Sequence, residues 1–104
     1  MKLVDVGFGN LVSLERIVSI AATESMPIRR LIQDAKDAGR AIDVSCGKKT
    51  ASVIITDSEY VVLSADTVET IKERIDNVDE MYDFLAKNFE KIQKLYFLVY
   101  LRYN

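Results

Sequence analysis

The chain has 104 residues, of which 49% are hydrophobic and 29% charged, a composition typical of a single globular domain. It has no histidine and one cysteine, which excludes histidine-based acid–base catalysis and an internal disulfide and nearly excludes a common zinc site. No apolar run of about 18 residues and no signal-peptide pattern are present, so we expect a cytoplasmic protein without a membrane partner. The net charge of −2 does not indicate a strongly basic nucleic-acid-binding domain, so such a role would need local clusters of cations.

Two extended segments open the chain. Residues 2–6 alternate as a strand, and Gly7-Phe8-Gly9-Asn10 predicts a hairpin turn rather than a dinucleotide-binding loop, because the third glycine and the following helix of that motif are missing. Residues 11–21 are rich in Val and Ile and predict a second strand. Arg16 interrupts its apolar face, which indicates either a bulge that turns Arg16 outward or a face that meets a partner.

The clearest element is an amphipathic helix over residues 27–38. Pro27 suits the first turn, Ser25 or Met26 is the expected cap, and Gly39 is a natural C-terminal stop. Apolar residues fall at helical spacing on one face. They are Ile28, Leu31, Ile32 and Ala35.

A short extended segment at residues 41–46 should follow this helix, and residues 51–56 and 60–64 predict a β-hairpin. Asp66 with Glu69 resembles an acidic capping box and predicts the start of a second helix. The order β-β-α-β-β-α predicts a small α+β domain with an antiparallel-rich sheet.

The C-terminal part is harder to interpret. We expect a helix break at residues 76–79 with a new cap at Asp79, then further helix, while residues 96–103 fit either helix or strand. We therefore expect a domain at residues 1–75. Residues 76–104 should be a mostly helical tail, first acidic and then apolar-aromatic, packed on the same or a neighbouring subunit.

No catalytic constellation is found. Residues 47–50 superficially resemble a phosphate loop, but they lack the upstream glycine and precede a strand instead of a helix. Cys46 has no histidine partner, so it is expected to be a small buried or half-buried residue and not a nucleophile. We expect no enzyme activity, no cofactor, no metal site and no small-molecule substrate.

The remaining candidates are local cations. Arg29 and Arg30 lie in the first turn of the helix, where cations oppose the helix dipole, and Lys48 and Lys49 lie on a turn. Together with Arg16 they are candidate phosphate contacts, with the alternative that they are ordinary solvated side chains. A single copy would bind weakly, whereas an oligomer would repeat the contacts.

Several short motifs occur in a fixed order: residues 6–10, 12–13, 16–17, 27–30, 33–35, 47 with 50, 57–58 and 62–64. As a set they resemble the extracellular matrix regulatory protein A (RemA) family over residues 3–75. The resemblance implies a LytTR-like fold, rings of seven or eight subunits and a cytoplasmic DNA-binding regulator of biofilm-matrix genes. It assigns DNA contact to Arg16, Arg30, Lys48 and Lys49, and oligomerisation to Pro27.

The chain departs from the family pattern at one turn. The family has Gly-Arg-Arg-Thr-Arg where this chain has Gly47-Lys48-Lys49-Thr50-Ala51. Lysine keeps the charge but loses the bidentate fork of arginine, so phosphate contact is expected to survive better than base recognition. We therefore expect a ring-forming regulator that binds promoter DNA, with an oligomeric protein-interaction module that has lost DNA binding as the alternative.

Overall fold

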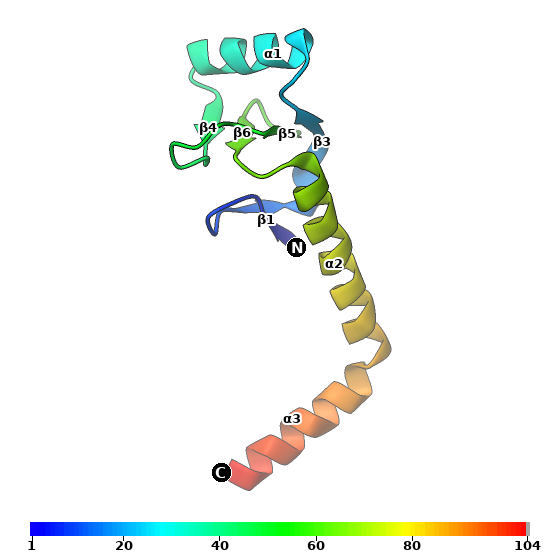
Figure 1. The fold of residues 1–104 in the computed structure, drawn as a ribbon. Coiled ribbons are helices and arrows are strands. Elements are labelled where there is room, and N and C mark those ends of the chain that lie inside the picture. Colours follow the sequence, from blue (N-terminus) through cyan, green and yellow to red (C-terminus); the bar gives the residue numbers. More distant parts are fainter. Residues whose placement is uncertain (104) are drawn as a thin grey trace.

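The computed structural model describes residues 1–103, which form a two-sheet head (residues 1–75) and a helical tail (residues 76–103) (Figure 1). The elements are β1 (Leu3–Asp5), β2 (Leu11–Ser13), the 3-10 turn η1 (Leu14–Arg16), β3 (Ile17–Ala22), α1 (Met26–Asp37), β4 (Ala41–Asp43), β5 (Ser52–Thr56), β6 (Val61–Ser64), α2 (Val68–Lys87) and α3 (Phe89–Tyr103). The predicted α+β class is confirmed. No helix within residues 1–103 is both long and apolar enough to cross a membrane.

The larger sheet has the strand order β3-β5-β6-β4, and the smaller sheet is the β1-β2 hairpin. All pairs are antiparallel except β4 with β6. α1 connects β3 to β4 and lies over one face of the larger sheet (Figure 1). The hairpin turn predicted at residues 7–10 and the hairpin predicted over residues 51–64 are confirmed.

Two apolar clusters hold the head together, one on each face of the larger sheet. Val53 and Leu63 are fully buried beneath α1, which contributes Ala35. Ile54 faces the other way and packs with β1 and with Ile71 of α2. The sheet is thus covered on both faces, which explains why β5 and β6 read as continuous apolar runs.

The single strand predicted over residues 11–21 is wrong. The 3-10 turn η1 separates β2 from β3, and the register against β5 shifts between Ile17 and Ser19. Leu14 and Ile17 pack against the core while Arg16 turns outward. Of the two explanations for Arg16 in an apolar strand, the backbone irregularity is therefore the correct one.

The capping box predicted for the second helix is also wrong. Thr67 is the N-cap of α2, and its hydroxyl accepts a hydrogen bond from the Thr70 N–H at 3.2 Å. Asp66 instead accepts from Arg74 at 2.6 Å, and Arg74 also donates to the Asp5 carbonyl at 3.1 Å. The carboxylate is used to attach α2 to β1 and not to start the helix.

The break predicted at residues 76–79 does not occur, because the acidic side chains there have cationic partners. Asp76 pairs with Lys72 one turn earlier at 3.0 Å, and Asp79 pairs with Lys2 at the N-terminus at 3.1 Å. α2 therefore continues to Lys87, and the chain changes direction at Asn88. The predicted helical character of the tail is confirmed, and residues 96–103 are helical.

Candidate nucleic-acid interface

The predicted cations lie at opposite ends of the larger sheet. Residue 22 at the end of β3 pairs with residue 52 at the start of β5, so the turn with Lys48 and Lys49 lies at this end, called here the Lys49 end. Ile17 at the start of β3 pairs with Thr56, which places Arg16 at the other end, called here the Asp57 end. β3 has six residues and separates the two ends by about 20 Å.

The turn at the Lys49 end has a rigid backbone. The Lys48 N–H donates to the Ser45 carbonyl at 3.0 Å, and both central residues, Cys46 and Gly47, have positive φ, as in a type I′ turn. Asp43 accepts bonds from the N–H and the hydroxyl of buried Ser45 at 2.9 and 2.6 Å. These bonds lower the pKa of Asp43, so its carboxylate stays ionised and fixes the base of the turn.

Cys46 is exposed at the tip of this turn, which contradicts the prediction of a buried or half-buried residue. Its φ of +53° points the side chain away from the sheet, and turn geometry rather than side-chain polarity decides its exposure.

A second turn lies beside the first. Phe8 sits between two glycines in the β1-β2 turn, is 55% exposed, and lies under the Lys48 ammonium, with 5.3 Å between Nζ and the ring centroid. A cation over an aromatic face is a favourable contact, and an exposed ring beside a cation is a surface on which a base can stack. Sequence reasoning missed Phe8, although a large aromatic residue between two turn glycines is a detectable signal.

Arg29 belongs to the same end of the sheet. Its Nε donates to the Thr23 carbonyl at 3.1 Å, and the Thr23 hydroxyl donates to the Thr50 carbonyl at 3.0 Å. α1 and the lysine turn are thereby joined through one residue. Ser25, one of the two predicted caps, is the N-cap of α1, and its hydroxyl accepts a hydrogen bond from the Ile28 N–H at 3.4 Å. The arginine side chains, rather than free N–H groups of the helix, would therefore hold an anion.

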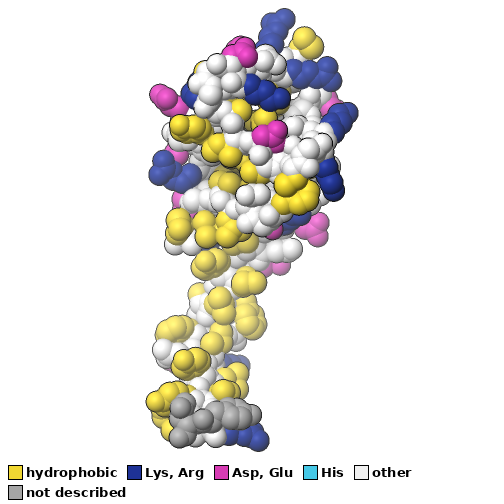
Figure 2. All heavy atoms as spheres, turned by 90° about the vertical axis from the view of Figure 1, so that its left-hand side faces the viewer, with side chains coloured by type: hydrophobic (Ala, Val, Ile, Leu, Met, Phe, Trp, Pro, Cys, Tyr) yellow, Lys and Arg dark blue, Asp and Glu magenta, His cyan; other side chains and the backbone are white. Residues whose placement is uncertain are grey.

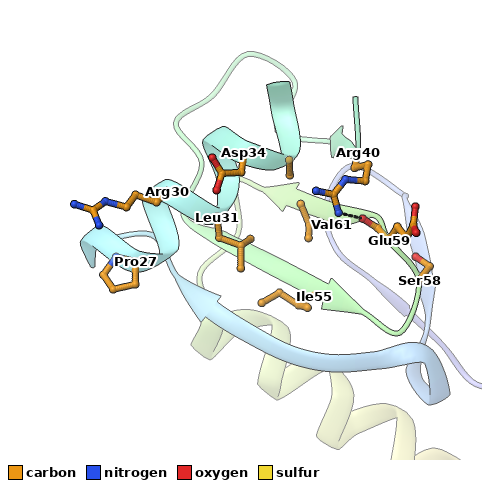
Figure 3. A pocket seen from close by; sticks show the side chains of 10 residues that line it. Pro27, Arg30, Leu31, Asp34, Arg40, Ile55, Ser58, Glu59 and Val61 are labelled. Atoms are coloured by element: carbon orange, nitrogen blue, oxygen red, sulfur yellow. Dashed lines mark hydrogen bonds between the residues drawn. The ribbon is translucent and has the colours of Figure 1, made fainter. Parts of the chain in front are cut away.

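Arg30 points outward from the first turn of α1, beside a groove of about 470 Å³. Figure 3 shows Pro27 and Arg30 at one end of this groove and Arg40 with Glu59 at the other, with apolar side chains between them. Pro27 is exposed at its rim. The groove joins the two ends of the head along α1.

Arg16 stands apart from the other cations. Its Nε donates to Asp57 of the β5-β6 turn at 2.7 Å, and the two side chains are 62% and 48% exposed. The turn that carries Arg16 is attached to the N-terminus, since Glu15 accepts from the Lys2 N–H at 3.1 Å and from the Ser13 hydroxyl at 2.8 Å. These two hydrogen bonds lower the pKa of Glu15 to about 2.

The structure thus unites Arg29, Lys48 and Lys49 with Phe8 at one end and leaves Arg16 at the other. Lys and Arg side chains are spread over the head, and hydrophobic side chains follow the tail (Figure 2). Asp57 is the second residue that sequence reasoning missed. One subunit offers two separate basic spots, and only a second subunit could bring the Arg16 spot of one copy close to the Lys49 end of another.

Comparisons with known proteins identify the family of the chain. A family model for extracellular matrix regulatory protein A-like proteins matches residues 3–75. A Clostridium botulinum protein is 49% identical over 83 residues, which cover 80% of this chain and 93% of the relative. A Clostridium novyi protein is 49% identical over 81 residues (78% and 90%), and a Bacillus pumilus protein is 46% identical over 83 residues (80% and 93%).

The names of these three relatives describe them as regulatory proteins and specify no ligand. About a fifth of this chain lies outside each match, and the family model ends at residue 75, within α2. The match covers all strands of the head, both cation-bearing turns and α1. The chain belongs to the RemA-like family of regulatory proteins.

Proposed function

We propose that this protein is a cytoplasmic, DNA-binding transcriptional regulator of biofilm and extracellular-matrix genes that acts as a homo-oligomeric ring of seven or eight subunits. The candidate contacts are Arg16, Arg29, Arg30, Lys48 and Lys49. Each subunit would contribute a few phosphate contacts, and the ring would repeat them along the DNA. Pro27, at the rim of the α1 groove, is the proposed oligomerisation residue.

The observation that carries this proposal is the gathering of three cations beside a hydrogen-bonded turn at the Lys49 end. Lys48 and Lys49 project from a turn fixed by Asp43 and Ser45, and Arg29 is attached to the same turn through Thr23. A backbone that is already hydrogen-bonded loses little conformational entropy when its side chains meet a phosphate, unlike the backbone of a mobile chain. The exposed Phe8 ring adds a stacking surface beside them.

A second candidate function is an oligomeric protein-interaction module that has lost DNA binding. Two observations favour it: the net charge of −2 and the presence of Lys48 and Lys49 where the family has arginines. The two functions differ in their response to salt, because phosphate contacts release counterions on binding and an apolar interface does not.

A mobility-shift titration with promoter-length duplex DNA, run over a series of salt concentrations beside a native mass measurement, tests the proposal. We expect a multi-subunit particle and an affinity that falls steeply with salt. A particle that binds DNA equally weakly at all salt concentrations would favour the interaction module, and a monomer would contradict the ring.

The variant Lys48→Ala/Lys49→Ala should weaken DNA binding at least about tenfold for all DNA sequences and flatten the salt slope. Lys72→Ala is the matched control, because Lys72 is exposed on α2 and pairs with Asp76. Its loss should leave the titration nearly unchanged. Equal effects of the two variants would show that the Lys49 end is not the contact surface.

The ion pair of Arg16 with Asp57 allows a test in which DNA binding should become tighter instead of weaker. Asp57 holds its Nε at 2.7 Å and adds a negative charge where phosphate would approach. Asp57→Ala should therefore tighten DNA binding, and Asp57→Ala/Arg16→Ala should cancel that gain. If Asp57→Ala weakens binding, the ion pair orients Arg16 for DNA and does not compete with it.

A further inference from the structure

The tail carries an apolar repeat that continues through the bend at Asn88. The spacing between successive apolar residues alternates between three and four without a break, which is the a/d pattern of a coiled coil. The part of this seam beyond the head consists of Tyr82, Leu85, Phe89, Ile92, Tyr96 and Val99, all of which are exposed except the half-buried Ile92. Between residues 76 and 94 most other positions are polar or charged, so the stripe is distinct there.

The bend does not interrupt the phase of the repeat. The Asn88 N–H donates to the Phe84 carbonyl at 3.0 Å, and the Ile92 N–H donates to the Asn88 carbonyl at 2.9 Å. These are the i to i−4 bonds of an α-helix. The phase of the repeat is therefore kept through residue 88, while α3 leaves α2 at a wide angle (Figure 1), so a partner that covers both halves must carry the same bend, as a second copy does.

The seam has little cover within its own chain. α3 contacts α2 at their junction and extends away from the head (Figure 1). Phe89 is 59% exposed, Tyr96 75% and Val99 55%. Exposed apolar surface of this extent on a regular stripe marks an interaction site.

The charge distribution identifies the partner. Residues 76–83 carry four carboxylates and no cation, and Asp76 and Asp79 pair with Lys72 and Lys2 of the same chain, which leaves Glu80 and Asp83 for a partner; residues 87–94 carry three lysines and one glutamate. A second copy running in parallel would place like charges side by side, and a second copy running antiparallel places the acidic half of each tail beside the basic half of the other. We propose that the tails of two copies pair as an antiparallel coiled coil along this seam.

The register follows from the same charges. A two-fold axis near residue 87 sets Tyr82 opposite Ile92 and Leu85 opposite Phe89, and it brings residues 79–83 beside residues 91–95. Aromatic side chains bury roughly 150–250 Å² each, so Tyr82, Phe89 and Tyr96 together supply more than half of the about 800 Å² per partner of a stable interface. This pairing is independent of DNA binding and would join two heads, or two rings, at opposite ends of the coil.

Disulfide trapping in the full-length protein tests the pairing and its direction. The background is Cys46→Ser, because Cys46 is exposed. In the antiparallel coil two copies of position 82 lie about 15 Å apart, and so do two copies of position 92. Tyr82→Cys and Ile92→Cys should therefore not link to themselves under mild oxidation, while a mixture of the two should form the mixed disulfide.

Self-linked Tyr82→Cys would show a parallel coil, and no link in the mixture would show that the seams do not meet in this register; either result overturns the proposal.

Mass measurement of full-length variants gives a second test. Tyr96→Asp places a charge on the seam, and Phe97→Asp places one beside the seam on another exposed aromatic site. We expect Tyr96→Asp to halve the particle mass at micromolar concentration and Phe97→Asp to leave it unchanged.

Equal masses for the two variants and the parent would overturn the pairing, even if the DNA mobility shift is normal. Sedimentation with phosphatidylserine vesicles tests whether the apolar face of the tail binds a lipid membrane instead of a second copy. We expect no sedimentation of the full-length chain. Sedimentation that both aspartate variants abolish, without any change in mass, would assign the tail to lipid.

Discussion

In the head, Ile54 and Leu63 are completely buried, with a layer of protein on each face of the sheet. In α3, Leu98 and Tyr96 are 61% and 75% exposed, although α3 is the richer of the two regions in apolar residues. The head satisfies its own apolar pattern within one chain, and the tail does not. An apolar pattern therefore specifies a surface to be buried, while the fold decides whether the surface that covers it belongs to the same chain.

Truncation of one leucine in each region tests this difference in burial and has the largest expected effect. Leu63→Ala should destabilise the protein by about 2–5 kcal/mol, because the cavity forms in a core packed on both sides. Leu98→Ala should change the free energy of unfolding by less than about 0.5 kcal/mol, because the side chain is exposed and lies off the seam. Urea unfolding monitored by circular dichroism measures both. A large effect of Leu98→Ala would mean that α3 is buried against the head.

A glycine substitution examines how tightly the head is joined to α2. Gly7 has φ of +126°, and a Cβ there would lie 3.2 Å from the Asp66 carboxylate. Gly7→Ala should cost about 1–3 kcal/mol through backbone strain and a displaced carboxylate. Gly9→Ala is the control, because Gly9 also has positive φ but nothing within 4 Å. In thermal unfolding the melting temperature of Gly7→Ala should be lower than that of Gly9→Ala. The reverse order would show that strain within the turn, and not the contact with Asp66, determines the loss of stability.

The junction of the two tail helices offers a smaller effect. Asn88 ends α2 with φ of −114°, and its side chain donates to the Phe84 carbonyl at 2.8 Å. Asn88→Ala should stabilise a continuous helix by about 0.5 kcal/mol, since alanine has the higher helix propensity. Helical ellipticity should rise, and Asn88→Gly should lower it. No difference between these variants would show that the bend is set by contacts elsewhere.

The smallest expected effect is the pH dependence contributed by Glu15. Two hydrogen bonds lower its pKa from 4.5 to about 2, so its contribution to stability is complete above pH 4.5 and is lost as the pH falls toward 2. Glu15→Gln should flatten this part of the melting-temperature profile. The part that remains should include Asp43, whose lowered pKa has the same sign. An unchanged profile would show that the N-terminal bonds of Glu15 do not persist in solution.

Local signals were enough to predict several elements. Ser25 and Pro27 mark the start of α1, Gly39 follows its end with φ of +70°, and the β5-β6 hairpin is recognisable from two short apolar runs and the polar turn between them. These features depend on neighbouring residues only, so their physical cause is visible in the sequence.

Other features depended on residues far apart in the chain. The helix break predicted at residues 76–79 is absent because Lys2 neutralises Asp79 from the opposite terminus, and the cap predicted at Asp66 is absent because Arg74 takes its carboxylate. Phe8 belongs to the candidate site because the fold places its ring beside Lys48. No local pattern contains these pairings.

The sequence by itself determined the α+β class, the positions of the candidate cations and the heptad spacing of the tail, because each is a matter of composition or of spacing along one element. Which of the cations lie close together follows from the fold alone. It placed Arg29, Lys48 and Lys49 at one end of the sheet and Arg16 at the other, because β3 runs antiparallel to β5 and carries the chain from one end to the other. It also left the tail seam uncovered, since both faces of the sheet were already occupied by α1, the β1-β2 hairpin and α2.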